Sequence, residues 1–140
     1  MRALKKTKMD RIKIKSVMEM VSEADALVET LNVAEAKAHL EADSAIFIDL
    51  RDIREVAKTG KVRGAHHVPR GMLEFWIDPQ SSYHKDFFTS DQKFIFYCAG
   101  GWRSALAAKT AQEMGLQPVA HLEGGMKAWI EAAGATDPLK

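Results

Sequence analysis

One stretch decides how this chain is interpreted: Lys93-Phe94-Ile95-Phe96-Tyr97-Cys98-Ala99-Gly100-Gly101-Trp102-Arg103-Ser104. It opens with a short apolar and aromatic run, Phe94 to Tyr97, which is typical of a buried β-strand. After the two glycines, residues 104–114 are rich in strong helix formers, and Gly115 follows as a stop. The sequence therefore predicts a strand, a tight loop and a helix, with the only cysteine of the chain where the strand ends.

This arrangement favours an anion at Cys98. A loop that folds back onto a helix N-terminus directs several backbone N–H groups at one point, where the helix dipole adds positive potential. Arg103 adds a fixed positive charge, and the two glycines permit the positive φ that so tight a loop needs. A lone cysteine at a strand end is usually a small buried hydrophobe. The Gly-Gly, Arg and Ser that follow favour a thiolate nucleophile instead.

The segment Cys98-Ala-Gly-Gly-Trp-Arg103-Ser104 resembles the active-site loop of rhodanese-like sulfurtransferases, in which Cys and Arg bound a six-residue loop. Two further blocks of the chain resemble the early and late motifs of this family. They are Phe47-Ile-Asp49-Leu-Arg51-Asp-Ile-Arg-Glu55 with Gly60-Lys-Val-Arg-Gly-Ala-His-His-Val-Pro69, and Leu122-Glu-Gly-Gly-Met-Lys-Ala-Trp129. The resemblance covers about residues 30–134.

The expected fold is an α/β rhodanese-like domain. Predicted strands alternate with helices along the chain, which favours a mostly parallel sheet with helices on both faces. The resemblance implies the same arrangement, with five strands. We expect a basic leader and helical extension at 1–29, the rhodanese-like domain at 30–134 and a loose tail at 135–140. The extension contains an amphipathic helix over residues 16–28, which begins with the capping-box pair Ser16 and Glu19 and is expected to pack on the domain.

The resemblance implies a sulfurtransferase that moves a sulfane sulfur from a small anionic donor such as thiosulfate to cyanide or a cellular thiol, through a Cys98 persulfide. The loop that binds the substrate and cradles the persulfide would consist of Ala99, Gly100, Gly101, Trp102, Arg103 and Ser104. In it, Arg103 would hold the anionic donor, Ser104 would cap the helix and bond to the sulfur, and Trp102 would wall the entrance. Apolar cover is expected from Met72, Phe75 and Trp76.

Asp49 and Arg51 are expected to support this site. They come at the end of a short apolar strand, and open α/β sheets place their ligand sites at the carboxyl ends of strands. A buried ion pair that holds the loop is the favoured interpretation for Asp49. Arg51 is left open between that role and a cation near the anionic donor.

Composition excludes little and points to a soluble domain. The formal charge of +1 indicates no particular partner, and a single cysteine excludes an intramolecular disulfide. No run is long enough for a membrane span, and the basic N-terminus lacks the apolar core of a signal peptide, so the expected location is the cytoplasm. We expect neither a nucleic acid nor a membrane as partner.

No metal and no organic cofactor are expected. His66 and His67 are adjacent in a predicted strand and point to opposite faces, so they cannot chelate one ion together. His39, His84 and His121 are each isolated in the sequence, and none is interpreted as a general base.

Two other classes of function stay open. The first is a non-catalytic binding module, or a protein-to-protein sulfur relay that uses the helical extension and a protein acceptor. The second is a Cys-dependent phosphatase or arsenate reductase. Protein tyrosine phosphatases and the related cell-cycle phosphatases place five residues between Cys and Arg, whereas this sequence has four.

Overall fold

A five-stranded parallel sheet forms the centre of the molecule in a computed structural model, which describes residues 7–8 and 12–139. The predicted basic leader therefore lies largely outside the described residues. The strand order is β1-β6-β5-β2-β4, and every pairing is parallel. The bounds are β1 Glu29–Leu31, β2 Ala45–Asp49, β4 His66–His67, β5 Lys93–Tyr97 and β6 Val119–Leu122. The predicted five-stranded parallel sheet is confirmed.

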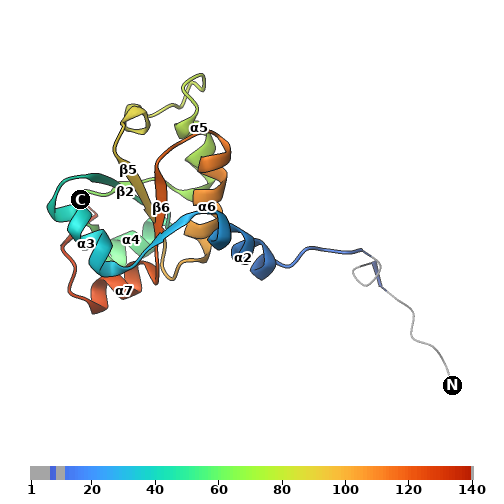
Figure 1. The fold of residues 1–140 in the computed structure, drawn as a ribbon, viewed down its shortest axis with the longest axis horizontal. Coiled ribbons are helices and arrows are strands. Elements are labelled where there is room, and N and C mark those ends of the chain that lie inside the picture. The colour runs from blue at the N-terminus through green and yellow to red at the C-terminus, as the bar shows by residue number, and fades with distance from the viewer. Residues whose placement is uncertain (1–6, 9–11, 140) are drawn as a thin grey trace.

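Helices cover both faces of this sheet (Figure 1). The central strand β5 is buried on both sides, because Phe94 and Phe96 join one apolar cluster while Ile95 and Tyr97 join the other. One face carries α2 Val17–Leu27, α5 Leu73–Ile77 and α6 Trp102–Glu113, and the other carries α3 Val33–Glu41, α4 Ile53–Thr59 and α7 Gly125–Glu131. Two 3₁₀ turns, Arg70–Met72 and Asp86–Thr89, belong to the connection between β4 and β5.

The helical extension packs on the domain, as the sequence predicts. Ser16 accepts a hydrogen bond from the Glu19 amide at 3.0 Å and starts α2. Val21 and Ala24 are buried against Ala105 of α6, which fixes α2 beside that helix. Only part of the predicted apolar stripe packs on the domain. Val17, Met20 and Leu27 of the same helix remain exposed.

Helix α6 begins earlier than the sequence indicates, and this changes the role of Ser104. Its N-cap is Gly101, whose φ of 123° lets the chain turn straight into the helix. Ser104 therefore lies inside the first turn, and the prediction that its side chain caps the helix is wrong. Gly100 does not need a positive φ, so only one of the two glycines meets that expectation.

The C-terminal segment is more ordered than predicted. Thr136–Asp137 forms β7, which pairs antiparallel with β3, Lys61–Val62. A carboxylate oxygen of Asp137 also accepts a hydrogen bond from the Gly64 amide at 2.8 Å. The predicted loose tail is therefore wrong at these residues. The sequence gives no signal for this strand, because two residues are too few to show an alternation of apolar and polar side chains. None of the helices among residues 7–8 and 12–139 has the length and hydropathy to cross a bilayer.

Candidate active site

Cys98 lies directly after the central strand, with a side chain that is only 1% exposed. The first turn of α7 holds the backbone of its loop: the Cys98 carbonyl accepts from the Met126 amide at 2.8 Å, and the Ala99 carbonyl accepts from the Lys127 amide at 3.2 Å. This contact requires a glycine at position 125, because a Cβ there would lie 2.4 Å from the Cys98 carbonyl oxygen. The late Gly-Gly motif thus positions the loop that carries the cysteine.

The sulfur contacts a backbone amide and a hydroxyl group. The Gly101 amide, at the N-terminus of α6, donates to Sγ at 3.1 Å, and Sγ lies 3.6 Å from the hydroxyl oxygen of Ser104. The predicted contact between Ser104 and the sulfur is thus present. A backbone amide at a helix N-terminus stabilises negative charge on its acceptor, so the environment suits a thiolate or a persulfide.

The space beside the sulfur is a pocket of about 420 Å³ lined by residues 98–103. Trp102 is 64% exposed and lines both this pocket and a neighbouring one, at the position expected for a wall of the entrance. The apolar cover expected from Met72, Phe75 and Trp76 is not part of the pocket lining. Trp76 packs against the core cluster of the sheet instead, and Phe75 is exposed.

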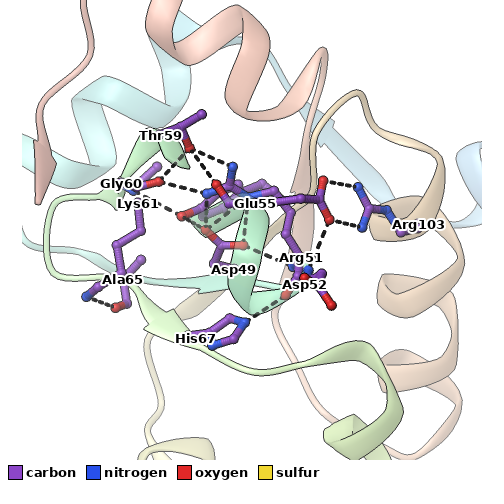
Figure 2. A network of polar contacts seen from close by, with 12 residues as sticks. Asp49, Arg51, Asp52, Glu55, Thr59, Gly60, Lys61, Ala65, His67 and Arg103 are labelled. Carbon is purple, nitrogen blue, oxygen red and sulfur yellow. Dashed lines mark hydrogen bonds and ion pairs between the residues drawn. The ribbon is translucent and has the colours of Figure 1, made fainter. Parts of the chain in front are cut away.

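Arg103 is held by Glu55 rather than pointing freely into solvent (Figure 2). Its Nη1 and Nη2 donate to the two carboxylate oxygens at 2.8 and 2.9 Å, a bidentate geometry that fixes the guanidinium plane. The same carboxylate accepts from the Asp52 amide at 3.0 Å and so completes the capping box of α4. Hydrogen bonds from Arg103 lower the pKa of Glu55 from 4.5 to about 2. The pKa of Arg103 is raised, first by Glu55 and to a lesser extent by Cys98.

Glu55→Gln is expected to destabilise the fold in a pH-dependent way. The folded-state pKa of about 2 lies below the ordinary 4.5, so the ion pair contributes fully above pH 4.5, and its contribution is lost as the pH falls through about 2. Glutamine keeps a carbonyl oxygen for the Asp52 amide, so the change isolates the charge. Denaturant unfolding of both proteins should show the largest difference in unfolding free energy at pH 7, and the difference should shrink as the pH falls from 4.5 through about 2. An equal difference at both ends of this range would contradict the pairing.

Asp49 and Arg51 form a buried ion pair at the end of β2 (Figure 2). Arg51 Nη2 donates to Asp49 Oδ2 at 2.7 Å, and Tyr97, the last residue of β5, donates its hydroxyl to the same oxygen at 2.7 Å. Burial, followed by the negative charge of Asp49, raises the pKa of Tyr97. Burial lowers the pKa of Arg51, but the hydrogen bonds with Asp49 and the negative charge of Asp49, with smaller effects of Tyr97 and Glu55, together outweigh it, and the net shift is upward. The network ties the strand that precedes Cys98 to its neighbour β2.

The guanidinium of Arg51 also binds Thr59 Oγ1 and the Gly60 carbonyl, both at 2.8 Å, and the side chain is only 2% exposed. It is thus engaged at the end of α4. The arrangement matches the favoured interpretation for Asp49 and gives Arg51 the same role: together they hold the connection between β2 and α4, which carries Glu55.

Sequence reasoning missed His121. Its Nδ1 lies 3.1 Å from the Ser104 hydroxyl, and its Nε2 lies 3.0 Å from Asp25 Oδ1 and 3.2 Å from Thr30 Oγ1. The interpretation of this histidine as isolated is wrong. A signal existed: His121 is near the carboxyl end of β6, next to the strand that carries the cysteine, and it pairs in register with Phe96. The contact with Asp25 spans 96 residues and has no local signature.

Comparison with known proteins places the chain in a family. Residues 32–132 match the model of the rhodanese-like domain. A protein of unknown function from Rhodopseudomonas palustris CGA009, described as a possible tyrosine phosphatase, has a solved structure that is 51% identical. That structure superposes with a TM-score of 0.87 over 91% of this chain and 98% of the other.

Two curated relatives are more distant. The tRNA uridine(34) hydroxylase of Cronobacter sakazakii is 29% identical over 84% of this chain but only 33% of its own length. The mouse thiosulfate sulfurtransferase/rhodanese-like domain-containing protein 3 is 27% identical over 69% of this chain and 64% of its own length. The chain thus spans about a third of the first of these relatives and under two thirds of the second. The match over residues 32–132 includes the Cys98 loop, the Glu55 segment and the Gly124-Gly125 turn, and the chain belongs to the rhodanese-like domain family.

Proposed function

We propose that this protein is a sulfurtransferase that carries a sulfane sulfur on Cys98. The observation that supports this most strongly is the placement of the sulfur: Cys98 Sγ accepts a hydrogen bond from the Gly101 amide at the N-terminus of α6, beside a pocket lined by its own loop. Backbone dipoles aimed at a small anion stabilise it without any further side chain. Family membership supports sulfurtransferase chemistry in general, and the donor and the intermediate are part of the proposal.

The reaction runs in two displacements. The Cys98 thiolate attacks the outer sulfur of thiosulfate and forms an S–S bond, while the bond between that sulfur and the sulfonate breaks and its electron pair leaves as sulfite. An acceptor nucleophile, cyanide or a thiolate, then attacks the outer sulfur of the persulfide, and the Cys98 thiolate leaves. The protein returns to its starting state with no net change in its own oxidation state, so the proposal requires neither metal nor organic cofactor.

Arg103 has a defined part in this proposal. Glu55 fixes its guanidinium plane at the end of the Cys98 loop, so the positive charge stays close to the loop at little cost in side-chain entropy. An anionic donor that enters the loop pocket meets this charge together with the helix N-terminus. The outer sulfur of the donor is thereby brought to the thiolate, which is the effect expected of substrate positioning.

A tyrosine phosphatase activity is the alternative raised by the description of the Rhodopseudomonas palustris relative. A transferring phosphoryl group carries charge on three equatorial oxygens and needs a wide ring of donors. Here only four residues separate Cys98 from Arg103, one fewer than in the phosphatases. A persulfide adds one atom to the sulfur, and this smaller ring suits it better than a phosphoryl group.

Steady-state assays test the proposal against this alternative. With thiosulfate and cyanide the protein should form thiocyanate, while an aryl phosphate should release no phosphate. Phosphate release without thiocyanate would overturn the assignment in favour of the phosphatase.

A third arm addresses the relatives that are named tRNA uridine(34) hydroxylase. Unmodified tRNA is incubated with the protein, digested and examined for hydroxylated uridine by mass spectrometry. We expect none. Hydroxylated uridine in the absence of thiocyanate formation would replace sulfur transfer as the function.

A further inference from the structure

A continuous chain of side chains leads from the sulfur to the surface. Cys98 Sγ lies 3.6 Å from Ser104 Oγ, Ser104 Oγ lies 3.1 Å from His121 Nδ1, and His121 Nε2 lies 3.0 Å from Asp25 Oδ1. Ser104 and His121 are buried, whereas the side chain of Asp25 is 50% exposed. Cys98 lies on the loop after β5, Ser104 on α6, His121 on β6 and Asp25 on α2. Together these four side chains connect the reactive sulfur with water.

The chemistry of the end groups determines the direction of these hydrogen bonds. A carboxylate only accepts, so His121 Nε2 carries a hydrogen that it donates to Asp25. In a neutral imidazole Nδ1 is then an acceptor. The Ser104 hydroxyl has two acceptors in reach, His121 Nδ1 at 3.1 Å and the Gly101 carbonyl at 3.2 Å, and in the relay it donates to Nδ1. The lone pairs of Ser104 Oγ are left for the S–H of Cys98. Every group in the chain therefore donates outward, from the thiol to the carboxylate.

We propose that Asp25, His121 and Ser104 form a proton relay that removes the thiol proton of Cys98 and generates the nucleophile. Ser104 contacts the reacting sulfur, while His121 and Asp25 are positioning residues that act on it through Ser104. The inference rests on the proposed function only in taking Cys98 as the nucleophile, and it does not depend on the identity of the donor or the acceptor.

The proton movements balance within the chain. The S–H bond of Cys98 breaks as a new O–H bond forms on Ser104, and the original O–H bond of Ser104 breaks as an N–H bond forms on His121 Nδ1. The products are a thiolate and an imidazolium. The hydroxyl of Ser104 then donates to the thiolate, and both imidazolium nitrogens donate, one to Ser104 Oγ and the other to Asp25. The Gly101 amide stabilises the new negative charge on sulfur, and Asp25 stabilises the new positive charge.

The groups around His121 set its resting state. Burial lowers the pKa of His121 below 6.5, so the imidazole is neutral at pH 7, and the charges of Asp25 and Glu123 offset part of the cost of protonating it. Thr30 of β1 is the remaining polar neighbour on Nε2, and its hydroxyl oxygen can share that hydrogen with Asp25. A pocket of about 340 Å³ borders the same groups, since Asp25, Thr30, His121 and Glu123 are among its lining residues.

The position of Asp25 gives the extension a function. This residue lies on α2, outside the segment 32–132 that matches the family model, and α2 is fixed on α6 by Val21 and Ala24. Ala24 immediately precedes Asp25 and is fully buried, so the packing of the helix sets the position of the carboxylate. The rhodanese-like domain supplies the thiol, the hydroxyl and the imidazole, and the extension supplies the charge that completes the relay.

The test is the rate of Cys98 alkylation by iodoacetamide, measured from pH 6 to pH 10 on Asp25→Asn and on a matched control, Glu23→Gln. Glu23 lies on the same helix, and its replacement by glutamine removes the same charge. Glu23 pairs with Lys15 at the surface, however, and so does not belong to the relay. At pH 7 we expect Asp25→Asn to slow alkylation roughly tenfold. This is a part of the rate enhancement of about 10²- to 10⁴-fold that a positioned proton acceptor supplies, because Ser104 and His121 remain in place. Glu23→Gln should match the unmodified protein. Near pH 10 all three rates should converge, because solvent then removes the thiol proton directly.

A second variant separates the relay from packing. His121→Ala should slow alkylation at pH 7 at least as much as Asp25→Asn, and added imidazole should restore part of the rate, because the adjoining pocket can admit it. Equal rates for Asp25→Asn and Glu23→Gln at pH 7 would overturn the proposal. A deficit that is as large at pH 10 as at pH 7 would also overturn it, since that is the behaviour of a structural defect. Alkylation needs no sulfur donor, so a failure of the proposed sulfur transfer would leave this result intact.

Discussion

Cys98→Ser is expected to reduce thiocyanate formation from thiosulfate and cyanide on the order of 10⁴-fold or more, to the background rate. A serine hydroxyl is not ionised near neutral pH and forms no bond to sulfur that a second nucleophile can reopen. The fold should survive, because the replacement is nearly isosteric and its oxygen can still accept from the Gly101 amide.

Cys98→Ala is the matched variant for this experiment, since it removes the hydroxyl as well as the thiol. Both variants should be equally inactive and should unfold at denaturant concentrations close to that of the unmodified protein. Sulfur transfer at near the original rate in either variant would show that the sulfur is carried elsewhere.

Arg51→Met is expected to cost about 3–5 kcal/mol of unfolding free energy, the range observed when one member of a buried ion pair is removed. The substitution leaves the Asp49 carboxylate fully buried with no cation, and it also removes the donors to Thr59 and to the Gly60 carbonyl. Asp49 is bonded to Tyr97 as well, so we expect the strain to reach the strand that precedes Cys98. Activity should therefore fall together with stability.

Arg54→Met provides the control for this prediction. Arg54 also pairs with a neighbouring carboxylate, that of Asp52, but its side chain is 90% exposed. Solvent screens exposed pairs of this kind, so this variant should be nearly as stable as the unmodified protein. Denaturant unfolding of both variants gives the comparison. Similar losses for Arg51→Met and Arg54→Met would mean that the Asp49–Arg51 pair does not hold the β2–α4 connection.

The features that follow from local sequence were predictable. The strand before Cys98 is a continuous apolar run, the loop is marked by its glycines, and Ser16 accepts from the Glu19 amide to start its helix as expected. The alternation of such elements is sufficient to predict a parallel sheet with helices on both faces. The family motifs then place Cys98 and Arg103 on one loop.

Features that depend on packing could not be predicted. Gly134 follows α7, which ends at Glu131, and a glycine is required there because a Cβ would lie 2.3 Å from the Trp129 ring. Arg103 looks like a free cation in the sequence, but it is bound by Glu55, 48 residues away. The three contacts of His121 come from α2, β1 and α6, and only the folded sheet brings them together.

The most direct test of the central claim is the intact mass of the protein before and after treatment with thiosulfate. The account predicts that the mass rises by that of one sulfur atom, that the addition survives gel filtration and is absent in Cys98→Ser, and that excess cyanide removes it. Since the chain has no second cysteine, the sulfur cannot be lost to a disulfide within one chain. An unchanged mass after thiosulfate, or a disulfide-linked dimer as the main product, would contradict the assignment of Cys98 as a persulfide carrier.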